Sequence, residues 1–330
     1  TGPGPAPCLV PGTGHRHGRE HGPGSGHGPG HGRGHGPGPG HGPGPGLGRG
    51  KKLQPNPVAA WALANGIELL QPEQPTRELA DWMVAEETAV ALVMAYGHFL
   101  QQPLREAAQY GMLNFHGSLL PQYRGASPVE TALASGDTET GVALMQVVKK
   151  MDAGGVADFE AVRISQQDTG PELRVKVGEA VVPLLRRNLA AMLTGELQFT
   201  QQDTSLVTYC RKMRKEDGAV DFTLPAVTIY NRLRAFTPWP GGYFDHGEVR
   251  IKIGRTSVEI DESVSAEPGT VLSTSPAVRV ATANGVLCCH ELQRPGARML
   301  PVEDFLCGYT LAEGDRLIGG TADPLVRKEP

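Results

Sequence analysis

Three side chains of different chemistry stand where two predicted strands end. Asn114 and His116 are two residues apart at the end of one strand, and Asp152 follows the next apolar run. Residues two apart on a strand share one face, and the carboxyl ends of strands in an open α/β sheet border the ligand crevice. An amide, an imidazole and a carboxylate at that edge suit acyl transfer: the amide donates to an oxyanion, the imidazole moves protons, and the carboxylate orients or charges the imidazole. Taken alone, an Asn-x-His pair is more often a simple loop cap than a catalytic pair.

The elements that must position these side chains alternate between strands and helices. Apolar periodicity and Pro or Ser starts predict helices over Pro57–Asn65, Arg77–Ala85, Leu104–Tyr110, Ser127–Ser135 and from Asp168 to about Leu193. Apolar runs predict strands over Ile67–Leu70, Thr88–Ala95, Gly111–Asn114, Gly141–Lys149 and Phe159–Ile164. This alternation predicts an open, parallel α/β sheet with helices on both faces.

The chain changes character after Gly195. Its short apolar runs are separated by Gly, Pro and Asn at irregular intervals, which is typical of a small antiparallel barrel. We therefore expect a linker at 196–208 and a second folded domain at 209–330. The predicted elements include strands at Val249–Ile253, Val278–Ala281 and Val286–Leu292 and a helix at Ala226–Ala235.

The first fifty residues differ in composition from the rest. Gly, Pro and His fill 37 of these 50 positions, as 20 Gly, 10 Pro and 7 His. A segment with so few apolar side chains cannot bury enough surface to offset the entropy of ordering its backbone, so we predict that residues 1–47 are disordered. The alternative is a tract that gathers Zn²⁺ or Ni²⁺ through His15, His17, His21, His27, His31, His35 and His41.

Charge and apolar content exclude several classes of protein. The 330 residues are 39% apolar and 20% charged, enough for two buried cores, and the net charge of −4 argues against a chain that coats nucleic acid by bulk charge. No apolar stretch reaches the roughly 18 residues of a membrane span, and no signal-peptide pattern opens the chain. Five Cys fit neither a disulfide framework nor a paired zinc site. We expect a monomer in the reducing cytoplasm that requires no metal.

The Asn-His-Asp pattern belongs to a longer motif. Residues 113–128 read LNFHGSLLPQYRGASP, and Met-Asp-Ala-Gly follows at 151–154. With further matches in the same order, the chain resembles the 10-formyltetrahydrofolate-dependent formyltransferases from about Gly48 to Gly319. Those matches are Gly48–Leu53, Pro55–Pro57, Ala95–Gly97, Gly136–Gly141, Thr208–Tyr209, Lys215–Glu216, Arg234–Phe236, Pro238–Pro240 and Pro268–Val271.

The resemblance implies a Rossmann-like catalytic domain of the formyltransferase fold at 48–195 and an OB-like, tRNA-binding barrel at 209–330. It implies transfer of a formyl group from 10-formyltetrahydrofolate to the amino group of methionyl-initiator tRNA, in support of translation initiation. The residues that match the catalytic motif are Asn114, His116 and Asp152. The implied folate contacts are Tyr96, Gly97, Ser118, Leu119, Leu120 and Pro121, and the implied tRNA contacts are Arg49, Lys51, Lys52, Arg211 and Lys212. The tRNA surface could include Arg214, Lys215, Arg232 and Arg234, which are otherwise ordinary solvated cations.

The chain departs from the family pattern at its start. The family begins with a strand, a Gly-Thr-Pro-x-Phe loop, a helix and a second strand, and the Gly/Pro/His segment stands in their place. A missing first strand would leave two strand edges without a neighbour, and we expect Leu9-Val10 not to substitute for it. Either this N-terminal sequence is truncated or mis-read, or it is a genuine leader, and the stability and activity of the literal chain depend on which.

Two other functions remain open on the sequence. A related enzyme could formylate an amino sugar nucleotide or hydrolyse formylfolate with the same three residues, although the basic loop at Gly48–Leu53 favours tRNA. A chain that lost catalysis with its first strand could instead be a tRNA- or metal-binding remnant. Preserved Asn114, His116 and Asp152 argue against that third function.

Overall fold

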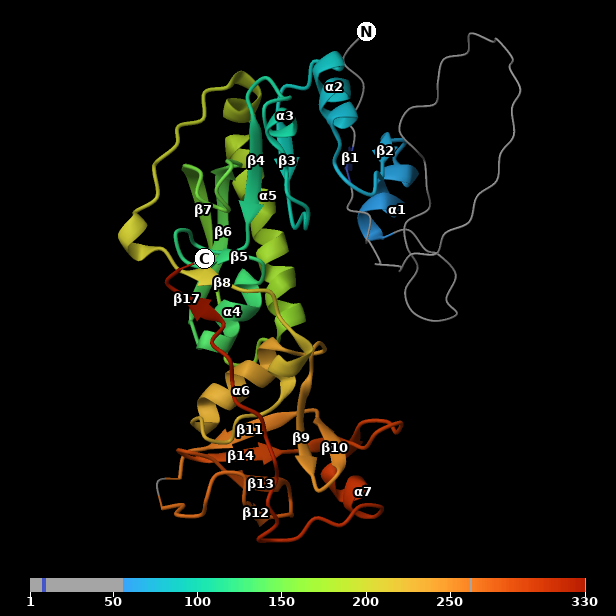
Figure 1. Ribbon diagram of the computed structural model, residues 1–330, viewed down its shortest axis with the longest axis vertical. Helices are drawn as coiled ribbons and strands as arrows, with labels where there is room; N and C mark the ends of the chain where they lie inside the picture. The colour runs from blue at the N-terminus through green and yellow to red at the C-terminus, as the bar shows by residue number, and fades with distance from the viewer. Residues whose placement is uncertain (1–7, 10–55, 262, 330) are drawn as a thin grey trace, which may run out of the picture. The chain divides into compact units, whose positions relative to one another are not determined.

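The computed structural model describes residues 8–9, 56–261 and 263–329 (Figure 1). These residues divide into two compact units. One unit holds the described residues up to Leu113 together with Met192–Gly195, and the other holds Asn114–Ala191 and the chain from Glu196 onward. The predicted domain boundaries at 195 and 208 follow composition rather than this division, and they stay a prediction. Except for Cys8 and Leu9, the Gly/Pro/His segment with its seven His lies outside the described residues.

The first unit is built mainly from short helices. Helix α1 (Pro57–Ala64) begins with Pro57, and the side chain of Asn56 accepts a hydrogen bond from the Ala59 N–H at 2.9 Å, which caps the helix. Helix α2 (Arg77–Ala85) has the predicted bounds and buries one apolar face. The other elements are strands β2 (Leu69–Leu70) and β3 (Ala91–Val93) and helix α3 (Gln102–Arg105).

Two local predictions in this unit are wrong. The helix expected at Leu104–Tyr110 ends at Arg105, because the N–H groups of Gln109 and Tyr110 bond to the carbonyls of Thr88 and Ala89 instead of to the preceding helical turn. The strand expected at Thr88–Ala95 is shorter in the structure, where it is β3. Thr88 and Ala89, whose carbonyls accept these bonds, lie outside it.

The first described residues of the chain form a short strand. Strand β1 (Cys8–Leu9) pairs in parallel with β2, with Cys8 opposite Leu69 and Leu9 opposite Leu70. Strands β1 and β2 form a two-stranded sheet of their own and do not join the sheet that contains β4, so the expectation that Leu9-Val10 does not substitute for the missing first strand stays a prediction. A strand edge offers N–H and C=O groups to any extended segment, so two residues suffice to pair with it.

The second unit contains neighbouring strands of one sheet, in the order β4-β6-β7. These strands are β4 (Met112–His116), β6 (Glu139–Gln146) and β7 (Val156–Arg163). The open α/β sheet is confirmed but is not fully parallel, because β7 runs antiparallel to β6. Only residues 147–155 join the two strands, and a parallel crossover needs a dozen residues or more. Helix α4 (Pro128–Ser135) follows β4, and helix α5 (Gly170–Thr194) bonds to β7 through Arg187.

The rear part of the second unit contains two four-stranded antiparallel sheets, ordered β16-β15-β10-β9 and β11-β14-β13-β12, and Figure 1 shows the second of them with its strands side by side. One apolar core includes Phe244 and Ile251 from the first sheet, Val280 and Leu287 from the second, and Ile229 from helix α6 (Ala226–Ala235). This confirms the predicted antiparallel rear part. The strands are β9 (Gly242–His246), β10 (Val249–Ile253), β11 (Thr256–Glu259), β12 (Val271–Ser273), β13 (Val278–Ala281), β14 (Val286–Cys289), β15 (Glu291–Gln293) and β16 (Leu300–Pro301), followed by helix α7 (Val302–Leu306).

A small third sheet brings distant parts of the second unit together. Strand β8 (Tyr209–Cys210) pairs in parallel with β5 (Arg124–Gly125) and antiparallel with β17 (Val326–Arg327). Arg124 and Gly125 of the motif at residues 113–128 therefore share a sheet with residues 209–210 and 326–327. Among the described helices, none is long and apolar enough to cross a membrane.

Candidate active site

Strand β4 presents Asn114 and His116 on one face. Leu113 and Phe115, which alternate with them, are 2% and 7% exposed and pack into the core. His116 is buried, whereas Asn114 is half-buried. Within the residues that the structure describes, the side-chain amide of Asn114 makes no hydrogen bond. This amide is therefore available to a substrate oxygen.

The two ring nitrogens of His116 have different partners. Nε2 lies 2.9 Å from the main-chain oxygen of Tyr123, and Nδ1 lies 3.7 Å from Oδ2 of Asp152. A carbonyl oxygen can only accept a hydrogen bond, so Nε2 carries a hydrogen and Nδ1 is the nitrogen that gains or loses a proton. The ring thus turns Nδ1 toward the carboxylate.

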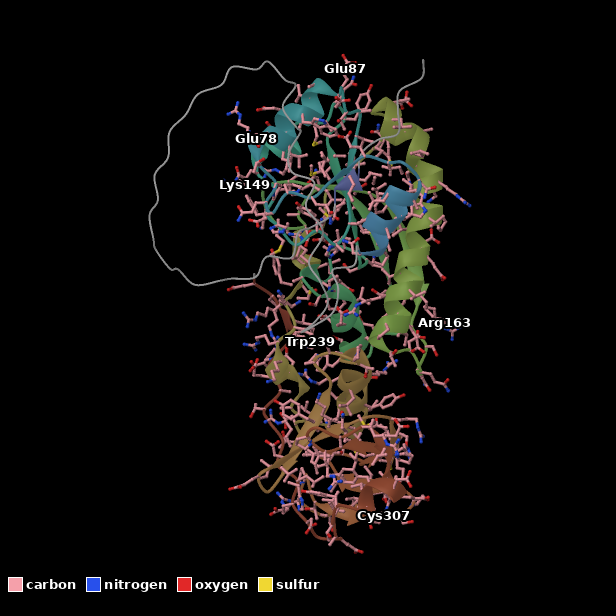
Figure 2. The ribbon with its side chains drawn as sticks, turned by 90° about the vertical axis from the view of Figure 1, so that its right-hand side faces the viewer. Glu78, Glu87, Lys149, Arg163, Trp239 and Cys307 are labelled. Carbon is pink, nitrogen blue, oxygen red and sulfur yellow. The ribbon has the colours of Figure 1, made fainter. Side chains whose placement is uncertain are left out.

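Asp152 stands in the loop that joins β6 to β7. Figure 2 shows Lys149 of the same loop at the surface, whereas the Asp152 side chain is only 17% exposed. Its Oδ2 accepts a hydrogen bond of 2.8 Å from the Gly125 N–H. The residue has φ of +48°, in the left-handed region that costs a non-glycine residue about 1–2 kcal/mol. The structure thus brings Asp152 and His116 together. Asn114 lies two residues before His116 on the same strand.

The backbone geometry at position 125 requires glycine. Its φ is +119°, and a Cβ atom there would lie 2.2 Å from the carbonyl oxygen of Cys210. Only glycine permits β5 to approach β8 this closely while its N–H points at Asp152. Gly125 lies within the motif at residues 113–128, but the sequence alone predicts no role for it.

Tyr123 is held in place from both ends. Its backbone has φ of +57°, and its hydroxyl donates to Oδ2 of Asp137 at 2.6 Å. Burial and the contact with Asp137 raise the pKa of Tyr123, so its hydroxyl stays protonated at neutral pH. This contact fixes the loop whose carbonyl orients His116.

The turn that contains the expected folate contacts is tightly folded. Ser118 is fully buried and its hydroxyl donates to the Gln122 carbonyl at 2.6 Å, while Leu120 packs with Ala143, Met145 and Val156. These two side chains shape the turn and do not face outward. Leu119 and Pro121 are half-buried and can contact a ligand.

Two further expected folate contacts, Tyr96 and Gly97, belong to the first unit. The Tyr96 ring is half-buried and lies 5.4 Å from the ring of His98, measured between centroids. Burial raises the pKa of Tyr96. Gly97 is exposed on the loop that follows β3.

The expected tRNA contacts divide into several groups. Arg49, Lys51 and Lys52 lie outside the described residues. Lys212 is exposed and has no ion pair within the described chain. Arg211, in contrast, is turned inward: its guanidinium donates to both carboxylate oxygens of Asp217, at 2.7 and 2.5 Å, and its Nε donates to the Pro324 carbonyl at 3.0 Å.

The contacts of Arg211 correct its expected role. Its side chain is 12% exposed and that of Asp217 only 2%, so this cation is committed to an internal pair and is not free for a phosphate. Arg214 pairs with Asp323, and Arg234 donates to the carbonyls of Ser165 and Asp168. Of the six rear cations considered from sequence, Lys212 and Lys215 alone are exposed without an ion pair in the described part of the chain.

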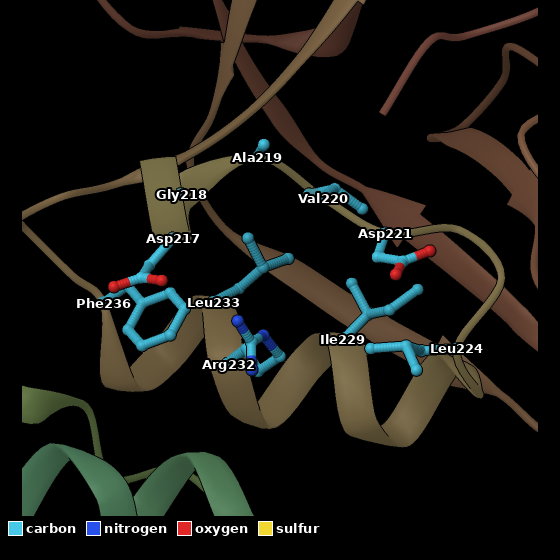
Figure 3. A pocket seen from close by; sticks show the side chains of 10 residues that line it. All are labelled: Asp217, Gly218, Ala219, Val220, Asp221, Leu224, Ile229, Arg232, Leu233 and Phe236. Atoms are coloured by element: carbon cyan, nitrogen blue, oxygen red, sulfur yellow. The ribbon is translucent and has the colours of Figure 1, made fainter. Parts of the chain in front are cut away.

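Arg232 lines a small hollow above α6 rather than an outer surface. Figure 3 shows its guanidinium beside Phe236, between Asp217 and Asp221, and its central carbon lies 5.1 Å from the centre of the Phe236 ring. Burial lowers the pKa of Arg232. Asn114, His116 and Asp152 are not among the residues that line this hollow.

The Arg211–Asp217 pair yields a stability prediction. Arg211→Ala is expected to lower the free energy of unfolding by about 3–5 kcal/mol, because it leaves a buried carboxylate without its partner. Burial alone would raise the pKa of Asp217, but the hydrogen bonds from Arg211 and from the Arg214 N–H outweigh it and lower that pKa. The stabilisation is therefore present at neutral pH and is lost as the pH falls through the lowered pKa of Asp217. Urea unfolding at pH 7 measures it, and Lys212→Ala, within about 0.5 kcal/mol of the parent, is the control. Equal midpoints for both variants would contradict the assignment.

Two residues that the sequence alone does not predict support the Asp152 loop. These are Gln202 and Arg124: Arg124 donates to Gln202, and Gln202 donates to the main chain of the Asp152 loop. Arg124 lies within the quoted motif, which was a usable signal, whereas Gln202 stands in the predicted linker among other polar residues. Nothing local distinguishes it there.

Metal ligands do not gather in the described part of the chain: no group of three or more His, Cys, Asp or Glu side chains there could hold an ion. Cys288 and Cys289 lie in β14 and are buried in the rear part, as core residues.

Comparison with known proteins matches both parts of the chain. Residues 45–188 match the family described as formyl transferase, and residues 212–310 match the formyl transferase C-terminal domain. The methionyl-tRNA formyltransferase of Myxococcus xanthus is 38% identical over 269 residues, which cover 81% of this chain and 85% of that protein. The protein of the same description from Paraburkholderia phymatum is 37% identical, over 81% of this chain and 85% of its own length.

One solved structure extends the comparison to the fold. The N-formyltransferase from Helicobacter canadensis, solved with folinic acid and dTDP-3-aminofucose, has a TM-score of 0.55 and 14% identity, and the match covers 70% of this chain and 82% of that one. At this identity the likeness shows a shared fold.

Proposed function

Because this chain belongs to the methionyl-tRNA formyltransferase family, we propose that it transfers the formyl group of 10-formyltetrahydrofolate to the amino group of methionyl-initiator tRNA. We assign the chemistry to Asn114, His116 and Asp152. The observation that carries this assignment is the pairing of His116 Nδ1 with Asp152 at 3.7 Å, beside a half-buried amide that makes no hydrogen bond in the described chain.

The roles follow from what each group can donate or accept. The amino group of an aminoacyl ester resembles an α-amino group, whose pKa is about 7.7–8.0, so a useful fraction is unprotonated near neutral pH. The harder tasks are to stabilise the oxyanion and to protonate the departing nitrogen. One preorganised oxyanion donor contributes about 2.7–4 kcal/mol, which we assign to the Asn114 amide and to protonated His116. Asp152 orients the imidazole and helps to move its proton.

The residues available to the folate fit a flat, partly apolar group. 10-Formyltetrahydrofolate supplies the one-carbon unit when it is bound. Leu119 and Pro121 offer half-buried apolar side chains, and Ser118 and Leu120 hold the turn that presents them. Tyr96 and Gly97 remain proposed contacts on the loop after β3.

The tRNA contacts that we propose are Lys212 together with Arg49, Lys51 and Lys52. Lys215 extends the same set, since it too is exposed without an ion pair in the described chain. A net charge of −4 means that attraction to phosphates has to come from such local cations. We further propose that the protein acts in the cytoplasm, as a monomer, in translation initiation.

An acceptor competition tests the proposed function. Purified protein with 10-formyltetrahydrofolate is offered methionyl-initiator tRNA or an amino sugar nucleotide, and the formylated product is measured by mass spectrometry. We expect formylation of the aminoacyl-tRNA alone, with a rate that falls steeply as salt increases, because Lys and Arg contacts to phosphates are screened. Formylation of the sugar alone, or release of formate without an acceptor, would replace this function with one of the two related enzymes.

A further inference from the structure

The segment between α5 and β8 sends one side chain into the loop of Asp152. Gln202 is half-buried, whereas its neighbours Gln201 and Asp203 are exposed. Its Nε2 donates to the carbonyl oxygens of Asp152 and Gly154, both at 2.8 Å. These contacts join residues about fifty positions apart in sequence.

The side-chain oxygen of Gln202 also has hydrogen-bond partners. Oε1 of Gln202 accepts from Nε and Nη2 of Arg124, at 3.1 and 2.8 Å. A guanidinium can only donate and a carbonyl can only accept, so the orientation of this amide is unambiguous. Gln202 thus uses both of its donors and both lone pairs of its oxygen.

Arg124 connects this amide to the carboxylate of Asp152. Arg124 is 2% exposed and forms no ion pair within the described residues, so its charge is bound by the Gln202 oxygen. The next residue, Gly125, donates its N–H to Oδ2 of Asp152. Asp152 is therefore held at its main chain by Gln202 and at its carboxylate by Gly125.

The backbone of Asp152 needs such support. A non-glycine residue at φ of +48° persists only where its surroundings determine its conformation. Gln202 bonds to the carbonyls on both sides of Ala153, and these are the groups whose direction would change if the loop relaxed.

We propose that Gln202 is a positioning residue for formyl transfer, which sets the placement of the Asp152 carboxylate relative to His116 Nδ1. The proposal rests on the proposed function of that pair. It makes the segment that joins the two family-matched regions a part of the active site. Gln202 itself contacts no reacting atom and acts through Asp152.

The test is a double-variant cycle of Gln202→Glu and Asp152→Asn. A glutamate still accepts from Arg124 but cannot donate to the two carbonyls, so it removes the support of the loop without removing the ligand of Arg124. We expect Gln202→Glu to lower kcat about 10–100-fold, the range typical of residues that orient an active-site ligand, with KM for both substrates within about two-fold. In the Asp152→Asn background the same substitution should cost less than about two-fold. Gln201→Glu, one residue earlier and exposed, is the matched control and should keep the parent rate.

A second readout does not depend on turnover. The pH titration of the His116 ring, followed by NMR, should shift in Gln202→Glu toward the curve of Asp152→Asn, and it should be unchanged in Gln201→Glu. If Gln202→Glu unfolds, Gln202→Asn, an amide one methylene shorter that cannot reach both partners, takes its place. A parent-like rate and titration in the Gln202 variant, with Asp152→Asn impaired, would overturn the positioning role alone. A parent-like rate in Asp152→Asn would instead overturn the proposed role of the His116–Asp152 pair.

Discussion

The His116→Ala variant is expected to lose about 10²–10⁴-fold in kcat for formyl transfer, the usual contribution of a general acid–base. Nε2 is bound to the Tyr123 carbonyl, so Nδ1 is the atom of this ring that can take the proton from the attacking amine or give one to the departing nitrogen. Alanine removes that atom and leaves the Asp152 carboxylate without the imidazole that faces it. KM for both substrates should change less than kcat.

Two further variants distinguish a loss of catalysis from a loss of folding. His116→Asn keeps a polar group of similar reach that can donate to the Tyr123 carbonyl but cannot move protons, so it should be nearly as slow as alanine. His290→Ala removes an imidazole that bonds to Ser257 in the rear part, and it should keep the parent rate. Single-turnover kinetics and thermal melting on all three variants make the comparison. A His116→Ala enzyme within three-fold of the parent would refute the assignment.

The Asn114→Ala variant should lose about 10²–10³-fold in kcat, the cost of one oxyanion donor. This loss should come without loss of stability. The amide makes no hydrogen bond in the described chain, so alanine leaves no protein group without its partner. The unfolding midpoint in urea should therefore match that of the parent within error.

Asn114→Asp sharpens this test. A carboxylate has nearly the same shape but repels a developing oxyanion, so this variant should be at least as slow as alanine. Asn188→Ala on α5 is the control: its amide bonds to Asp158 and to the Leu184 carbonyl, so it should cost stability but not rate. A rate for Asn114→Ala above one third of the parent would assign the oxyanion to other donors.

The sequence predicted the elements whose ends depend on local signals. The bounds of α2, α6, β10 and β13 agree with the structure to the residue, because periodicity and turn residues mark them. The prediction failed at α3, where hydrogen bonds from Gln109 and Tyr110 to Thr88 and Ala89 override helical preference. It also failed for the direction of β7. That strand runs antiparallel to β6 because the loop at 147–155 is too short for a parallel crossover.

The same division applies to the site. The two-residue spacing of Asn114 and His116 placed them on one face, and the end of the next strand brought Asp152 near, so these positions could be anticipated. The inward turn of Arg211 could not, since one of its partners, Pro324, lies 113 residues away. Gln202 likewise acquires its meaning from carbonyls that only the folded chain brings within reach.

The three-stranded sheet β5-β8-β17 has a consequence for how the protein is made. Gly125, whose N–H holds Asp152, pairs with Cys210, and Cys210 pairs with Val326. Domains of a growing chain tend to fold in the order in which they leave the ribosome. Here the neighbour strand of the catalytic loop acquires its own outer partner only when residue 326 has been synthesised, so a nascent chain holding the complete motif still awaits its last strand.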